Sequence, residues 1–105
     1  DHAAAHDLVG CQPVEWDIAG AAVEHDLSSE ELSTLMRRVA LECGTAPSRD
    51  LVVVLTPCYL AFQLGLWTMA AASSEGAEAG RQQALADRYR ERLLEALMSE
   101  SLAAG

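Results

Sequence analysis

The first seven residues of the chain contain side chains that commonly ligate metals. His2 and His6 are four residues apart, a spacing that puts both imidazoles on one face of a helix, and Asp7 could add a carboxylate. A typical zinc site has three or four such protein ligands, and this pair has no third fixed one. Two interpretations stay open, a metal site or solvated polar residues ahead of the first helix, and we expect the second.

The three cysteines, Cys11, Cys43 and Cys58, are the candidate nucleophiles. None belongs to a Cys-x-x-Cys pair, and no local signature supplies a histidine base, so we assign no catalytic residue. Cys43 and Cys58 fall on apolar helix faces, and we expect both in the core. Three unpaired thiols are typical of a reducing compartment, which favours a cytoplasmic location.

Asp17 is the remaining candidate, because it stands in the run Trp16-Asp17-Ile18-Ala19 inside a predicted helix. A carboxylate beside apolar side chains is costly unless it is paired or reaches water. One residue turns a helix by about 100°, so a solvated Asp17 and a buried, partnered Asp17 both fit the pattern.

The elements that must position these residues are four predicted helices, which indicates an all-α fold. Apolar periodicity predicts helices over residues 14–25, 51–72 and 77–102. A further helix is predicted between the first and second of these, because Ser28 and Glu31 form a capping box and Gly44 supplies a stop. Residues 1–13 are expected to be an irregular lead-in, and 1–105 a single helical domain. Helical spacing predicts a core of nine residues: Leu32, Leu35, Val39, Leu55, Phe62, Leu66, Leu85, Tyr89 and Leu93.

The third predicted helix, 51–72, contains no charged residue and is long enough to cross a bilayer. Pro57, Gln63 and Gly65 lie in its interior, and no cluster of basic residues flanks it. We therefore expect an apolar central helix packed by amphipathic helices, and a membrane contact is the lesser alternative. Pro57 is expected to kink this helix near Val53 or to delay its start.

Composition narrows the classes of partner. The chain has seven arginines, no lysine and a net charge of −9, which leaves no basic surface for nucleic acid. Anionic membrane surfaces should repel such a chain.

Two runs of the sequence resemble a known superfamily. GCQPVEWDIAGAAVEHDLSSEEL (10–32) resembles the segment after the catalytic loop in the aminoglycoside phosphotransferase and choline kinase-like superfamily. Gly10, Gln12 and Pro13 resemble part of its GDPxxDLA pattern, and Asp17 begins a match to DLA. CYLAFQLGLWTMAAAS (58–73), followed by a helix rich in Arg and Glu, resembles the helical C-terminal lobe.

The resemblance implies roles for three aspartates. Asp17 would be the buried structural aspartate that accepts hydrogen bonds from the catalytic-loop backbone. Asp1 would be the candidate magnesium ligand, with Asp7 as its competitor. Mg²⁺ and ATP are implied for a full-length parent, and the partner of this chain would be the upstream kinase-like lobe.

The departures from the superfamily limit what this chain can do by itself. Phosphoryl transfer needs a phosphate clamp, a lysine and a base aspartate with its asparagine, and the chain has no lysine, no HxD loop and no Gly-rich turn. We expect no specific phosphorylation when it is incubated alone with magnesium and ATP. The expected function is the C-terminal helical subdomain of a kinase-like phosphotransferase, as a piece of a longer chain. The alternative is a free-standing acidic helical module for protein interaction or dimerisation.

Overall fold

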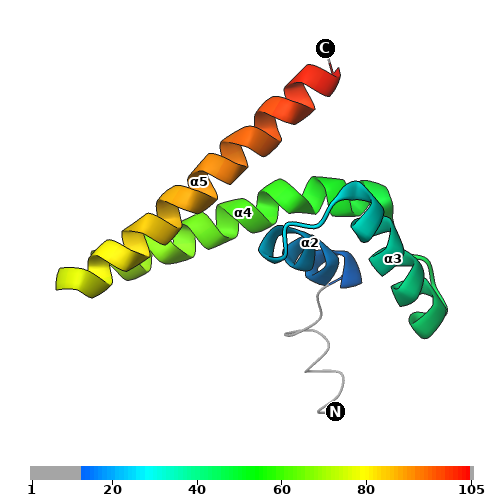
Figure 1. Cartoon of the computed structure of the whole chain (residues 1–105), viewed down its shortest axis with the longest axis horizontal. Helices are drawn as coiled ribbons and strands as arrows, with labels where there is room; N and C mark the ends of the chain where they lie inside the picture. Colours follow the sequence, from blue (N-terminus) through cyan, green and yellow to red (C-terminus); the bar gives the residue numbers. More distant parts are fainter. Residues whose placement is uncertain (1–12, 105) are drawn as a thin grey trace, which may run out of the picture. The chain divides into compact units, whose positions relative to one another are not determined.

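The computed structural model describes residues 13–104 of the backbone and the side chains of residues 13–99, and in this range it contains four helices and no strand (Figure 1). The predicted all-α fold is therefore confirmed. The chain divides into two compact units, Asp1–Val52 and Val53–Gly105.

Helix α2, Val14–Glu24, opens the first unit and follows the predicted range closely. Pro13 stands at its N-cap, where the missing backbone N–H costs nothing because that group has no helical partner. Four small or branched residues form its buried face: Ile18, Ala19, Gly20 and Val23. Helix α3 contacts α2 and contributes the buried Met36 to the same core.

Helix α3, Ser29–Cys43, has the capping box that the sequence predicted. The backbone N–H of Glu31 donates to the Ser28 hydroxyl at 3.1 Å, and the backbone N–H of Ser28 donates to the Glu31 carboxylate at 2.8 Å. Gly44 ends the helix in the left-handed conformation with φ 76°, which a residue without Cβ adopts freely. Both ends of α3 are thus set by local chemistry.

Removing the capping hydroxyl should weaken α3 measurably. We expect Ser28→Ala to lower the free energy of unfolding by about 0.5–2 kcal/mol, because the N–H of Glu31 loses its acceptor. Thr45→Ala, in the exposed loop after Gly44, is the control and should stay within about 0.5 kcal/mol. Urea titration followed by circular dichroism compares the two, and equal losses would refute a stabilising cap.

Helix α4, Arg49–Ala72, is the long apolar helix, and it begins two residues earlier than predicted. Ser48 caps it, since the Leu51 N–H donates to the Ser48 hydroxyl at 3.1 Å. The Ser48 N–H in turn donates to the Glu15 carboxylate at 2.7 Å, which ties α2 to the start of α4. Pro57 lies inside the helix, so the alternative of a delayed start was wrong.

Helix α5, Gly76–Ala104, follows a turn at residues 73–75 and packs against α4 in the second unit. Leu60 of α4 and Ala86 of α5 are almost fully buried. Asp87 of α5 is hydrogen-bonded within its own helix, since its Oδ1 atom accepts hydrogen bonds from the side chains of Gln83 and Arg90, at 3.0 Å each. These two hydrogen bonds, the one from Gln83 first, lower the pKa of the Asp87 carboxyl.

The predicted core was wrong in its details. Phe62 and Leu66 are exposed by 57% and 49%, and the other seven predicted core residues are only half-buried. Cys43 and Cys58 are exposed as well. The apolar residues that the structure buries form a different set: Ile18, Ala19, Val23, Met36, Val52, Leu60 and Ala86.

The physical reason for the difference lies mainly in α4. It does pack against α5 and, through its first turn, against α2, as an apolar helix between amphipathic ones should. Only 11% of its most apolar 18-residue window is buried, however. From Leu51 onward α4 has no charged residue on any face, so the sequence gives no signal for which face a neighbour covers.

Candidate functional site

The metal-site candidates of the sequence all belong to its first seven residues. Asp1 and Asp7, together with His2 and His6, lie outside the described residues. Within the described part of the chain, no group of three or more His, Cys, Asp and Glu side chains is arranged to hold a metal ion.

Asp17 lies on the exposed side of α2, one residue before the buried Ile18. Among residues 13–99 its carboxylate has no hydrogen bond or ion pair. Val14, one turn earlier, is also partly exposed at 39%. The structure therefore offers Asp17 to solvent next to an apolar neighbour and brings no other candidate residue to it.

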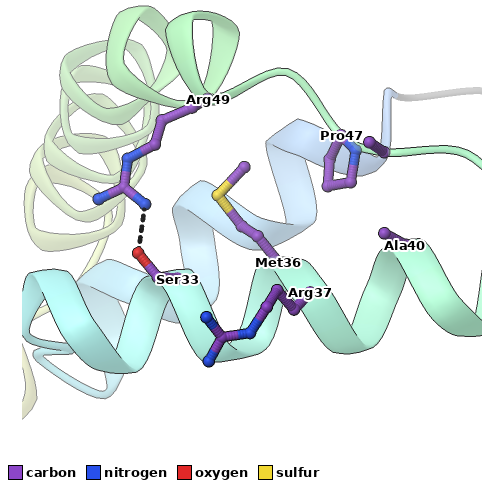
Figure 2. A pocket seen from close by; sticks show the side chains of 7 residues that line it. Ser33, Met36, Arg37, Ala40, Pro47 and Arg49 are labelled. Atoms are coloured by element: carbon purple, nitrogen blue, oxygen red, sulfur yellow. Dashed lines mark hydrogen bonds between the residues drawn. The ribbon is translucent and has the colours of Figure 1, made fainter.

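A shallow hollow of about 250 Å³ lies between α3 and the segment that leads into α4 (Figure 2). The Arg49 guanidinium donates to the Ser33 hydroxyl at 2.8 Å and to the Ser29 hydroxyl at 3.1 Å. Arg49 thus fastens the start of α4 to α3. The hollow is lined by Ser33, Met36, Arg37, Ala40, Ala46, Pro47 and Arg49.

The residues of this hollow have binding chemistry but not acid–base chemistry. Arg37 and Arg49 supply guanidinium groups, which accept no proton near neutral pH and hydrogen-bond carboxylates or phosphates. Met36 and Pro47 give the hollow apolar walls. Ser33 contributes the one side-chain hydroxyl of its lining, and that hydroxyl accepts the hydrogen bond from Arg49.

In the second unit, one side of α4 consists of exposed residues. Its residues repeat at intervals of three and four and are all exposed. We call this surface the outer face; it consists of Val54, Cys58, Ala61, Phe62, Gly65, Leu66, Thr68, Met69 and Ala72.

The outer face combines large and small side chains without any charge. Val54, Phe62, Leu66 and Met69 are exposed by 57%, 57%, 49% and 71%. Between them Gly65 has open space where a Cβ would stand, with no atom within 4 Å. The sequence predicted a core role for three of these residues, Cys58, Phe62 and Leu66, and missed the surface, because α4 has little contrast between its sides.

Helix α4 also meets the length and composition criteria for crossing a membrane, with a mean hydropathy of 1.6 over its most apolar window. It is the one helix of the described residues that does so. The helix packs against α5 and α2 as expected, and 11% of this window is buried.

Comparison with known proteins gives no relative for this chain: no family model, no curated protein and no solved structure matches it.

Proposed function

We propose that this chain is a helical interaction module whose outer face is covered by another protein surface. The observation that carries the proposal is the uninterrupted exposure of apolar side chains along α4 from Val54 to Ala72. Because this side of the helix has almost no polar groups, removing it from water by contact with another surface is favourable.

The size of the outer face supports a functional contact. A free side chain as large as Phe exposes on the order of 150–200 Å². At the observed exposures, the four large residues and the five smaller ones together offer roughly 600 Å². Soluble monomers rarely expose a contiguous apolar patch beyond a few hundred Å² unless it binds something.

A protein surface fits this face better than a bilayer interior. Helix α5 packs on α4 and carries exposed charges along its length, among them Arg81, Arg88 and Glu91. If α4 crossed a bilayer with α5 attached, these charged side chains would enter the hydrocarbon core. The free-energy cost of insertion is about 2.5–3.5 kcal/mol for each Arg, Lys or Asp side chain at the centre of the bilayer. A protein partner can cover the outer face and leave α5 in water.

Two native thiols provide the test. Cys58 lies on the outer face, whereas Cys43 is exposed at the end of α3 and serves as internal control. In a Cys11→Ser chain, we expect Cys58 to react with maleimide at least about tenfold more slowly than Cys43 inside cells. In the dilute purified chain the two rates should be similar.

Equal labelling of Cys58 and Cys43 inside cells would refute the proposal. A second outcome would also refute the proposal. If adding protein-free phosphatidylcholine vesicles to the purified chain slows Cys58 labelling as much as the cell does, the outer face binds a bilayer and not a protein.

A second candidate function, the helical tail of a kinase-like phosphotransferase, is favoured by one observation. The Asp17 carboxylate is exposed and has no hydrogen-bond or ion-pair partner among residues 13–99. This is expected of a carboxylate whose hydrogen-bond donors belong to a loop elsewhere in a longer enzyme. In that setting it would accept hydrogen bonds from the catalytic-loop backbone.

Asp17→Asn in the parent phosphotransferase tests this candidate. The change keeps the shape but removes charge-assisted hydrogen bonds worth roughly 1.5–3 kcal/mol each, so we expect phosphoryl transfer to fall about ten- to 150-fold with the fold intact. Glu24→Gln, exposed at the end of α2, is the matched control. Unchanged activity of Asp17→Asn would remove the candidate.

A further inference from the structure

The charge distribution of the chain permits two outer faces to meet. Residues 1–52 hold ten acidic residues against three arginines, whereas residues 53–105 hold six against four, so the net charge is −7 in the first range and −2 in the second. The outer face itself contains no charged residue. A second copy can therefore approach this face without placing like charges in contact, which would be costly in a desolvated interface.

The area of the outer face matches what a modest homodimer needs. Roughly 600 Å² from each of two copies gives about 1,200 Å² in total, the lower bound for specific protein–protein interfaces. Interfaces at this end of the range are weak, so a dissociation constant on the order of micromolar is expected.

The order of large and small residues along the outer face is self-complementary. In an antiparallel pair whose two-fold axis passes between residues 63 and 64, Phe62 meets Gly65 of the second copy and Leu66 meets Ala61. Met69 then meets Cys58. Large side chains of one helix are thus set against small ones of the other, which is how helices interdigitate closely.

We propose that the outer face of α4 binds the outer face of a second copy of this chain, so that two α4–α5 hairpins form a four-helix assembly. This inference rests on the proposed function and names its partner. Two-helix hairpins joined in this way enclose a core that one hairpin cannot, since each hairpin alone buries only Leu60 and Ala86 fully among its described side chains.

Two glycines make a matched pair for the test. Gly65 lies on the outer face of α4 and Gly80 on α5, both are exposed, and neither has an atom within 4 Å of the position of a Cβ. Leucine fits at both sites in the monomer and suits a helix better than glycine. Only Gly65→Leu places a bulky side chain where the second copy must approach.

Sedimentation velocity of the purified full chain over about 1–500 µM measures the result. We expect the wild-type chain and Gly80→Leu to shift from 11.2 kDa to twice that mass with rising concentration. Gly65→Leu should weaken the association at least about tenfold, with its helix content retained by circular dichroism. Met69→Glu is a second disrupting variant, because Met69 is 71% exposed and its loss leaves the monomer core untouched.

Three outcomes would overturn the proposal. They are a wild-type chain that stays monomeric throughout the range, a Gly65→Leu or Met69→Glu chain that dimerises as wild type, and a Gly80→Leu chain that loses the dimer. A monomeric wild-type chain whose Cys58 is still protected inside cells would remove the second copy and keep the proposed interaction with another protein.

Discussion

Leu60→Ala is expected to lower the free energy of unfolding of the second unit by about 2–5 kcal/mol, the usual cost of emptying a buried leucine site. Leu60 is 2% exposed and lies on the face of α4 that packs against α5. A helical hairpin has few other buried contacts to compensate for the cavity. We therefore expect the variant to lose most of its α4–α5 structure at ambient temperature.

Leu66→Ala is the matched control for that result, because Leu66 belongs to the same helix and is 49% exposed. Its loss should cost about 1 kcal/mol or less in the dilute, monomeric chain. Trp67 is half-buried in the second unit, so its fluorescence in a Trp16→Phe background follows unfolding of this unit alone. A larger loss at Leu66 than at Leu60 would show that the opposite face of α4 is the packed one.

Ile18→Ala is expected to destabilise the first unit by a similar amount, about 2–5 kcal/mol. Ile18 is 3% exposed and is the largest buried residue of α2, with Ala19 and Gly20 beside it. Neighbours this small offer few atoms that could relax into the cavity, which keeps the cost high. The loss should uncouple α2 from α3.

Val14→Ala gives the control on the same helix, since Val14 is 39% exposed and should lose less than about 1 kcal/mol. Half-buried Trp16 reports on this unit by fluorescence in a Trp67→Phe background. Urea titration of the two variants should separate their midpoints clearly. Coincident midpoints would contradict the packing of α2 on its Ile18 face.

The parts of the fold that were predictable from the sequence are those governed by neighbours along the chain. The capping box at Ser28 and Glu31 and the left-handed Gly44 involve residues within one helical turn, and both are present as predicted. Residues that meet across the fold gave no such signal. The Glu15–Ser48 hydrogen bond joins residues 33 positions apart, and nothing in either local sequence specifies the other.

The outer face was unpredictable for a different reason. Periodicity identifies a buried face by the contrast between apolar and polar sides, and α4 offers almost none. Phe62 was therefore placed in the core and Leu60 was not, although the structure has them the other way round. For Asp17, one sequence fitted both a solvated and a partnered carboxylate, and only the position of α2 against α3 shows its exposure.

Pro57 inside α4 has a consequence for how fast the chain regains its structure. The Thr56–Pro57 peptide bond is trans in the folded helix, whereas roughly 10–30% of such bonds turn cis in an unfolded chain. Those molecules cannot continue α4 through Pro57 until the bond isomerises, which takes tens of seconds at 25 °C. Since no proline follows Pro57, α5 can form at once and must then wait for the helix on which it packs. During that wait the apolar side of α5 stands open, so refolding at high concentration exposes this chain to aggregation in a way that its folded form does not.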